Sequence, residues 1–381
     1  MQFIEQFLNK IKTEQNVENE RLSPPNKNYA AHLLTINQFH PIASNLNENK
    51  SNESKLNKST NSKLACIDGG NAEILRAPDF SLQLIRLCAV VMQNNKTISL
   101  QRFEFYAAIT SFAENDEIKF KVEYFGENLD KEILPNEKHV TFNSFDRTII
   151  SGTERAEISK MGDVIRKFAE LSLAKKIAKQ LVSKDILLLD NSLKCYFTNE
   201  QLYWQQLFEE INKKDIILAA IIKTTSMLTQ SGKSIITVLQ LLSKQIQLGN
   251  NCWYYYPVIS FNNLLNDSEK NEKNDYPAEI LFAKLHAHAQ NIFRVEIFNK
   301  SYSQDNLTLL LSTLLQQSND AVFLGYPYCL VQADAFARVS NKEKDYLRVI
   351  SLSKAGKNND ASDALKYSVS ALNAHDGLDK K

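Results

Sequence analysis

The chain has 381 residues, and its 45 basic and 44 acidic side chains leave a net charge of +1. This length suffices for one large domain with insertions or for two domains. The balanced charge excludes a uniformly basic protein, so a nucleic-acid surface would have to be a local patch. The sequence predicts neither a signal peptide nor a membrane span, and its five cysteines form no Cys-x-x-Cys pair. We therefore expect a cytoplasmic protein with reduced thiols and no membrane partner.

The first sixty residues are expected to lie outside the main fold. Residues 2–21 place Phe3, Phe7 and Ile11 on one face and predict an amphipathic helix. Residues 44–63 are almost wholly Asn, Ser, Lys and Glu, a composition that cannot bury a core. The expected organisation is a helical N-terminal extension over 1–43, a flexible linker or loop over 44–63, one folded domain over 64–353 and a polar tail over 354–381.

From residue 64 onward, hydrophobic patterns predict strands and helices in a defined order. Strands are expected at 64–68, 82–93, 97–110 and 117–125, followed by a helix over about 153–183. Next come a strand at 185–190, a helix near 198–213, a strand at 215–223, two strands within 278–299, a helix near 304–317 and terminal helices. This order predicts an α/β protein with an RNase H-like mixed sheet flanked by helices, with insertions.

An aspartate stands at the end of each of two apolar runs. Asp68 closes Leu-Ala-Cys-Ile-Asp-Gly-Gly, and Asp190 closes Ile-Leu-Leu-Leu-Asp. A charge at the end of a buried strand is costly unless a partner or ligand binds it. The glycines after Asp68 are expected to let the backbone turn sharply and a ligand approach closely. If the two strands are parallel neighbours, both carboxylates emerge at the same edge of the sheet.

A third acid, Glu170, lies on the inward face of the predicted long helix, where an apolar residue is expected. The predicted helix and the strand after it run in opposite directions. From the helix end near residue 183 back to Glu170 is about 20 Å, and from Asp185 forward to Asp190 is about 16 Å. Because these two lengths nearly cancel, Glu170 should lie level with Asp190. Three carboxylates at one edge repel each other, and a divalent cation removes this conflict. Oxygen ligands suit Mg²⁺ or Mn²⁺ better than zinc, and such ions promote phosphodiester cleavage.

Each acid also has a purely structural interpretation. Asp68 can cap a turn with its glycines, and Asp190 can form an Asx turn or a helix N-cap. Glu170 can pair with Arg166 four residues earlier in the helix. Only the coincidence of all three acids favours a metal site.

Three segments, taken in order, resemble the NurA nuclease family. They are Cys-Ile-Asp-Gly-Gly at 66–70, Leu-Asp-Asn-Ser-Leu at 189–193 and Phe-Leu-Gly-Tyr-Pro-Tyr-Cys-Leu-Val-Gln-Ala-Asp at 323–334. In the family, an Ile-Asp-Gly-Ser segment, a helical Glu, an Asp-Gly-Ser-Leu segment and a Gly-Tyr-Pro…Ala-His segment follow each other. The resemblance covers residues 64 to about 350. This chain departs from the pattern at Gly70, Asn191 and Asp334, which replace serine, glycine and histidine.

The resemblance implies an RNase H-like, Mn²⁺-dependent DNA nuclease, with 5′→3′ exonuclease and single-strand endonuclease activity. It also implies a homodimer that docks on a hexameric HerA-type translocase in DNA end resection. The residues that match the family's metal-binding carboxylates are Asp68, Glu170 and Asp190, with Asp334 in the place of the motif histidine as a further ligand. The motif tyrosine is Tyr326, which is expected to position the DNA strand in the catalytic site together with Lys223. Lys223 matches a recurring lysine that we assign to a DNA phosphate.

Several alternatives stay open at this point. Glu154 and Glu157, near the start of the predicted helix, compete with Glu170 for the role of helical acid. Mg²⁺ is the alternative ion. The replacement of the motif histidine by Asp334 motivates a second function, that of a catalytically weak or inactive DNA-binding adaptor on a translocase. A third interpretation is a nuclease that acts in phage defence.

Overall fold

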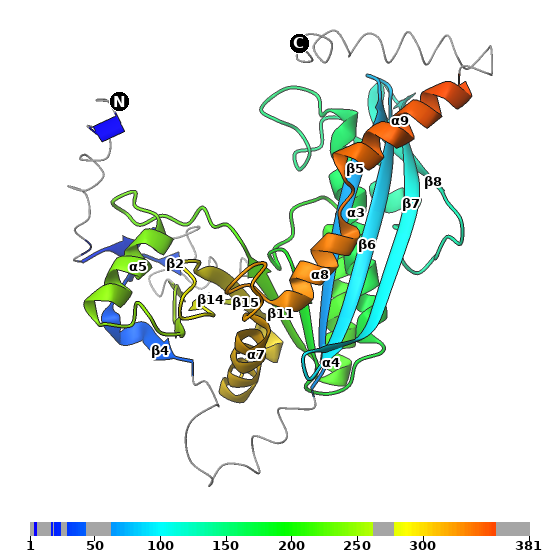
Figure 1. Cartoon of the computed structure of the whole chain (residues 1–381). Coiled ribbons are helices and arrows are strands. Elements are labelled where there is room, and N and C mark those ends of the chain that lie inside the picture. The colour runs from blue at the N-terminus through cyan, green and yellow to red at the C-terminus, as the bar shows by residue number, and fades with distance from the viewer. Residues whose placement is uncertain are drawn as a thin grey trace. The chain divides into compact units, whose positions relative to one another are not determined.

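The structure is a computed structural model that describes residues 4–5, 17, 19–23, 29–42, 62–261 and 278–355. The chain forms two compact units, whose elements are labelled in Figure 1. Unit 1 comprises Met1–Ser59, Asp190–Lys194 and Ile217–Tyr328, and unit 2 comprises Thr60–Leu189, Cys195–Ile216 and Cys329–Lys381. The predicted N-terminal helix, linker and tail lie almost entirely outside the described residues, and the predicted domain boundaries stay a prediction.

The sheet of unit 2 has the strand order β10-β5-β6-β7-β8-β9. Its strands are β5 (Leu64–Arg76), β6 (Phe80–Gln93), β7 (Lys96–Glu114), β8 (Glu117–Phe125), β9 (Phe142–Asn143) and β10 (Ile186–Leu189). Neighbouring strands from β5 to β9 are antiparallel, whereas β10 runs parallel to β5. Three antiparallel strands, a helix and a fourth strand parallel to the first are the predicted RNase H-like order, so the predicted fold class is confirmed.

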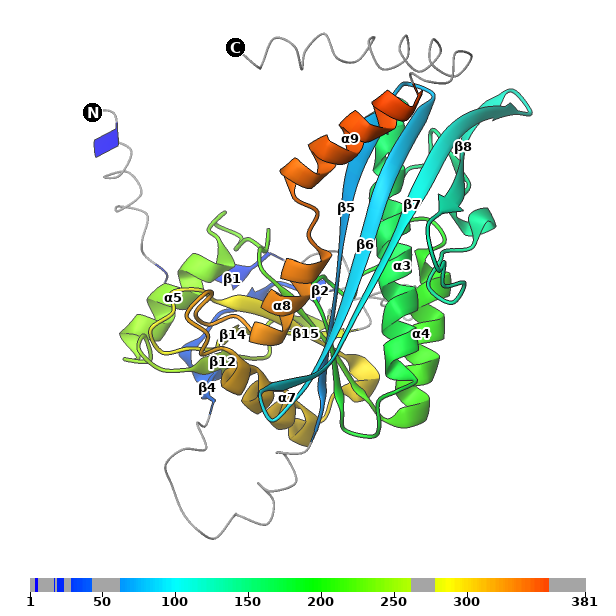
Figure 2. The same cartoon turned by 45° about the vertical axis from the view of Figure 1, so that its right-hand side comes forward.

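Helices lie on both faces of this sheet (Figure 2). The helices of unit 2 are α3 (Met161–Ala178), α4 (Glu200–Lys214), α8 (Tyr328–Ala337, of which unit 2 holds all but the first residue) and α9 (Asn341–Ala355). Helix α3 packs on β5 and β6, and α9 lies across the opposite face of β5. Both faces of β6 are covered, as the successive residues Leu87 and Cys88 are completely buried. The sequence of a strand that is covered on both faces is a nearly continuous apolar run, and this run allowed the strand to be predicted.

Strand β5 continues through the Asp-Gly-Gly segment, so the prediction that it ends and turns at Asp68 was wrong. Gly69 pairs with Leu87 and Gly70 with Arg86 in an antiparallel ladder that keeps its register from Leu64 to Glu73. The long partner strand β6 supplies hydrogen-bond partners on both sides of the glycines, and this pairing outweighs their weak strand preference. Asp68 therefore lies in the middle of a strand instead of at its end.

The long helix predicted over 153–183 is shorter at both ends. A 3-10 turn at Ile158–Lys160 precedes α3, which begins at Met161 and ends at Ala178. Before it, Gly152 has a left-handed φ of +69° and the Ala156 amide donates to the Ser144 carbonyl over 2.8 Å. These tertiary and turn interactions occupy residues that the sequence pattern assigns to the helix.

Unit 1 contains an antiparallel sheet with the order β4-β12-β14-β15-β11. Its strands are β4 (Phe39–Pro41), β11 (Ile217–Ile222), β12 (Trp253–Tyr255), β14 (Ala278–Lys284) and β15 (Phe293–Phe298), and its helices are α5 (Ile235–Gln245) and α7 (Gln304–Gln317). Short pairs join β1 (Arg21–Leu22) to β3 (His32–Leu33) and β2 (Tyr29–Ala30) to β13 (Ser260–Phe261). Short 3-10 turns cover Ile36–Gln38 and Asn299–Ser301 in unit 1 and Glu137–Val140 in unit 2.

Helix α5 was not predicted, although its sequence carries a clear signal. Ile235, Val238, Leu239 and Leu242 follow the spacing of one helical face, and all four are buried. Within the described ranges, no helix combines the length and apolar character that crossing a bilayer requires.

Candidate functional site

In unit 2, the candidate site is built around Asp68 on β5. Its side chain is 8% exposed, and one carboxylate oxygen accepts a 2.8 Å hydrogen bond from the Gly69 amide. Its cross-strand neighbour on β6 is Cys88. Burial, followed by the nearby Asp68 charge, raises the pKa of the Cys88 thiol to about 12. Without a bound cation, Cys88 therefore stays protonated at neutral pH.

Helix α8 brings a second carboxylate to this point. An oxygen of Asp334 lies within 4.8 Å of an oxygen of Asp68. Asp334 is half-buried and forms an ion pair with Arg338, four residues later. Two carboxylates this close repel each other unless a cation lies between or beside them. With oxygen atoms as its donors, the pair fits a hard divalent cation such as Mn²⁺ or Mg²⁺ better than zinc.

Gly70 allows α8 to come this near to β5. A Cβ atom on Gly70 would lie 2.5 Å from the backbone oxygen of Ala337, which is closer than any side chain permits. Residues two apart on a strand share a face, so Gly70 and Asp68 both face α8. Asp334 and Ala337 are three residues apart on a helix and also share a face. The close contact at Gly70 therefore sets the distance at which Asp334 faces Asp68.

Glu170 lies on the other face of β5, beneath Gly69. A Cβ atom on Gly69 would lie 2.6 Å from Glu170 Oε1, so the carboxylate fills the space that a side chain would occupy. Glu170 is 6% exposed and forms an ion pair with Arg166. Arg166 also approaches the Gly69 carbonyl at 3.4 Å, and its pKa is raised, chiefly by the charge of Glu170. The ion pair with Arg166, which was the structural interpretation of Glu170, is thus present in the structure.

The two rival helical acids are placed differently. Glu154 and Glu157 are exposed and precede α3. Glu157 forms a 2.7 Å ion pair with Arg76, in which both side chains are largely exposed. Among the three candidate acids, Glu170 is the buried one and the one next to the Asp-Gly-Gly segment.

In unit 1, three further predicted residues form a cluster of their own. Lys223, just after β11, places its Nζ atom 2.6 Å from Asp190 Oδ2. The Tyr326 hydroxyl donates to Asp190 Oδ1 over 2.8 Å, and the same lysine Nζ lies 5.0 Å from the centre of the Tyr326 ring. The cluster joins an acid, a base and an aromatic ring that lie far apart in the sequence.

The backbone after Asp190 is fixed by a buried acid. The Leu193 amide donates to Glu296 on β15 over 2.8 Å, and Glu296 is completely buried. Arg294 pairs with Glu296 at 2.7 Å and neutralises its charge. Because a buried charge pair resists rearrangement, this contact holds the segment that carries Asp190 in place.

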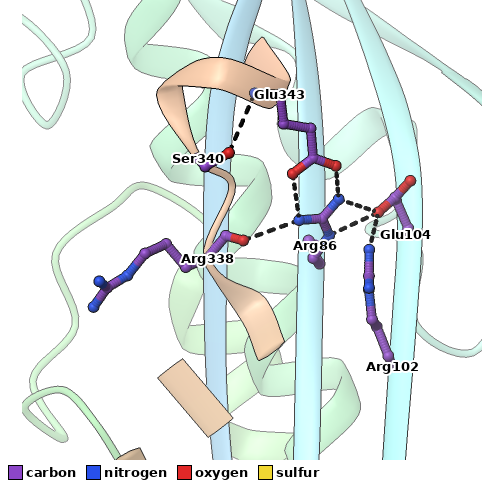
Figure 3. Close-up of polar contacts among 6 residues, drawn as sticks. All are labelled: Arg86, Arg102, Glu104, Arg338, Ser340 and Glu343. Atoms are coloured by element: carbon purple, nitrogen blue, oxygen red, sulfur yellow. Dashed lines mark hydrogen bonds and ion pairs between the residues drawn. The ribbon is translucent and has the colours of Figure 1, made fainter. Parts of the chain in front are cut away.

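Sequence reasoning missed the charged residues around α8 and α9, which Figure 3 shows together. Arg86 on β6 is 3% exposed and bonds to Glu104, Glu343 and the Arg338 carbonyl. A detectable signal was present, since Arg86 interrupts the apolar run Leu-Ile-Arg-Leu-Cys. A lone charge in a central strand requires a buried partner.

Comparison with known proteins identifies the family of the chain. A model of the NurA domain matches residues 62–339, whereas no curated protein matches the sequence. Similar solved structures include Ciona intestinalis endonuclease V in complex with an inosine-containing 24mer DNA, at 12% identity over 74% of this chain and 86% of that chain, with a TM-score of 0.35. Human ENDOV matches at 10% identity over 76% and 86% of the two chains, with a TM-score of 0.35. Argonaute of A. aeolicus matches at 11% identity over 74% and 30%, with a TM-score of 0.28. Because the NurA model spans well over half of the sequence, the chain belongs to the NurA family.

Proposed function

We propose that this protein is a divalent-metal-dependent deoxyribonuclease that uses Mn²⁺, with Mg²⁺ as the alternative ion. The observation that carries the proposal is the pair of carboxylates of Asp68 and Asp334, whose oxygens lie within 4.8 Å of each other in unit 2. A divalent cation bound there polarises a phosphodiester and lowers the pKa of a water molecule. The donor set supports this choice, because both donors are carboxylate oxygens, which hard divalent cations prefer.

Asp190 is proposed as the third acidic ligand. In the parallel ladder of unit 2, Leu189 pairs with Ile67, and an aspartate directly follows each of them in the chain. We infer that Asp190 and Asp68 leave this ladder at the same level. Asp190 also follows the last residue of β10, and the carboxyl ends of strands are where α/β folds bind their ligands.

The remaining residues are proposed to hold and orient the reacting groups. Glu170 lies on the other face of β5, and we propose that it adds a further carboxylate that approaches past Gly69; Arg166 balances its charge when no cation does so. Lys223 offers an ammonium group, 42% exposed, that can contact a DNA phosphate. The Tyr326 hydroxyl orients Asp190 through its hydrogen bond.

The family membership supports finer proposals about activity and partners. We propose 5′→3′ exonuclease and single-strand endonuclease activity, a homodimer, and docking on a hexameric HerA-type translocase in DNA end resection. These proposals rest on what the NurA resemblance implies and on no contact within this chain.

The substitution Asp68→Asn tests the metal site. It removes a ligand charge while keeping the shape of the side chain, so Mn²⁺-dependent cleavage of single-stranded DNA should fall by at least the 10–100-fold that is typical even of residues behind the ligands. Mn²⁺ binding, measured from the paramagnetic signal of the free ion, should weaken in parallel. The matched control is Asp79→Asn, which changes an exposed aspartate at the β5–β6 turn. Undiminished cleavage by Asp68→Asn would refute the assignment.

One observation favours the adaptor as a second candidate. Asp190, Asp334 and Glu170 each already hold a basic partner, namely Lys223, Arg338 and Arg166. Carboxylates neutralised by the chain's own bases need no cation. An adaptor would bind DNA and a hexameric ATPase in pull-down experiments, yet leave DNA intact in Mn²⁺, Mg²⁺ and Co²⁺.

A further inference from the structure

A buried arginine on β6 links the strand that carries the site to the corner between α8 and α9. Arg86 lies opposite Gly70 in the β5–β6 ladder, two positions from the Asp68–Cys88 pair. Its side chain is 4% exposed, and it faces the α8 side of the sheet, as Asp68 and Gly70 do. Figure 3 shows its guanidinium surrounded by acceptors from two other elements.

These acceptors hold the guanidinium from three directions. Glu104 on β7 accepts from Arg86 Nε over 2.7 Å, and the two oxygens of Glu343 on α9 accept from Nη1 and Nη2 over 3.1 and 2.5 Å. Nη1 also donates to the Arg338 carbonyl over 2.9 Å, just beyond the end of α8. Paired, two-pronged hydrogen bonds of this kind fix an arginine in both position and orientation.

The contact with the Arg338 carbonyl caps α8 at its C-terminal end. The last carbonyls of a helix lack partners within the helix and carry partial negative charge, so a buried cation stabilises them. The preceding carbonyl, that of Ala337, rests on Gly70. Two consecutive carbonyls of α8 are thus fixed against two paired residues, Gly70 on β5 and Arg86 on β6.

Asp334 lies one helical turn before these anchored carbonyls. The Arg338 amide donates to the Asp334 carbonyl over 2.9 Å, which places Asp334 in the same turn as the anchor. Ser340 then accepts from the Glu343 amide over 3.2 Å and begins α9, whose Glu343 returns to Arg86. The path from Arg86 to Asp334 therefore runs through a single turn of helix, and a movement of this turn moves the carboxylate relative to Asp68.

We propose that Arg86 is a positioning residue that sets the place of the Asp334 carboxylate against Asp68 and thereby the affinity of the site for its divalent cation. This inference rests on the proposed function, because it concerns the same metal site. Arg86 itself contacts neither Asp68 nor Asp334 through its guanidinium; it acts through the backbone at the end of α8.

The test compares Mn²⁺ binding by the whole chain and by its variants. Arg86→Met should weaken Mn²⁺ binding about 10–100-fold, the effect typical of residues that orient ligands from behind. Arg86→Lys, which keeps the charge but not the two-pronged contact, should recover part of this loss. Cleavage by Arg86→Met should return towards the wild-type rate at saturating Mn²⁺, with an unchanged KM for DNA. The control is Arg76→Met, which removes a largely exposed arginine of β5 and its ion pair with Glu157.

A double-mutant cycle shows whether Arg86 acts through Asp334. In an Asp334→Asn background, Arg86→Met should cause no further loss of Mn²⁺ affinity, since the positioned ligand is already gone. An equal loss in both backgrounds, or wild-type affinity in Arg86→Met, would overturn the positioning role. If the wild type binds Mn²⁺ through Asp68 while Arg86→Met binds equally well, only the positioning role fails. A wild type that binds no Mn²⁺ refutes the proposed function and this inference together.

A milder variant keeps the test decisive if Arg86→Met does not fold. Glu343→Gln leaves Arg86 and its bond to the Arg338 carbonyl in place but removes one charge from the anchor. We expect a smaller loss of Mn²⁺ affinity than for Arg86→Met, again absent in the Asp334→Asn background. Circular dichroism melting identifies the variants that fold. If folded Glu343→Gln and folded Arg86→Lys both keep the wild-type affinity for Mn²⁺, the proposal is overturned.

Discussion

At the scale of single residues, the two adjacent glycines of β5 serve opposite faces of one strand. Gly69 leaves room for the Glu170 carboxylate, and Gly70 leaves room for the Ala337 carbonyl. Neither glycine makes a turn, since both pair within the β5–β6 ladder. The absence of two side chains lets groups from two helices reach the strand beside Asp68.

Gly70→Ala should separate α8 from β5. Its Cβ would lie 2.5 Å from a backbone oxygen, which cannot rotate away as a side chain can. Overpacking of this kind costs about 1–3 kcal/mol of unfolding free energy. We also expect weaker Mn²⁺ binding, because Asp334 moves with the helix. Urea unfolding and Mn²⁺ titration measure both effects.

The matched control for this prediction is Gly249→Ala. A Cβ on Gly249 would meet Lys244 Cγ at 3.5 Å, an ordinary contact. We therefore expect a stability within about 1 kcal/mol of the wild type. Equal unfolding free energies of Gly70→Ala and Gly249→Ala would show that a Cβ atom at Gly70 does not destabilise the fold.

At the scale of elements, apolar contacts and the ion pair between Arg86 and Glu343 hold α9 on the sheet. Leu347 and Leu352 pack against the cluster of Ile74, Leu75 and Leu84. The hydrogen bonds from Arg86 hold the pKa of the Glu343 carboxyl below its usual value of 4.5. A pKa that is lower in the folded state stabilises the fold above the unfolded value and loses this contribution as pH falls.

The stabilisation from Glu343 should therefore be complete above about pH 4.5 and disappear as the pH falls through its lower folded-state value. Glu343→Gln should be less stable than the wild type at pH 7, and the two should converge in acid. Urea unfolding between pH 7 and pH 3 measures the difference. Glu157→Gln, from an exposed pair, should stay within about 0.5 kcal/mol of the wild type throughout. A constant difference for Glu343→Gln would contradict the ion-pair explanation.

Local sequence patterns predicted the elements of unit 2 well because its strands are long and apolar. The sequence alone predicted the order of strands and helices, the burial of Asp68 and Glu170, and the family motifs. The continuation of β5 past Asp68 was not, because it depends on pairing with β6 and not on the glycines themselves. The apolar run around Arg86 signals a buried charge, but the partners of Arg86 could not be predicted for the same reason, since they come from β7 and α9. Contacts between distant elements decide such features, and no local pattern records them.

At the scale of the whole molecule, the two units are interleaved along the chain. Unit 1 takes segments from three separate stretches, including β4 near the N-terminus, which pairs with β12. Phe39 of β4 packs edge-on against Trp253 and Tyr255, with ring centres 4.8 and 4.9 Å apart. The other tryptophan of the chain, Trp204, belongs to unit 2. Each unit thus contains its own fluorescent reporter.

Phe39→Ala should destabilise unit 1 by about 3–5 kcal/mol, because it removes a buried aromatic ring from the core. In a Trp204→Phe background, fluorescence of Trp253 should report this loss as an earlier transition in urea. In a Trp253→Phe background, Trp204 should report an unfolding transition of unit 2 that Phe39→Ala leaves unchanged. Equal shifts of both reporters would show that the two units unfold as one cooperative block.

Gly70 and Asp334 are two of the positions at which this chain departs from the family pattern of serine and histidine. Gly70 lets the α8 backbone lie nearer to β5 than any other residue would. Aspartate reaches less far from its helix than histidine, so it needs this nearer backbone to face Asp68. We therefore expect the two departures to compensate each other and to be inherited as a pair: relatives with a side chain at the first position should carry the longer residue at the second.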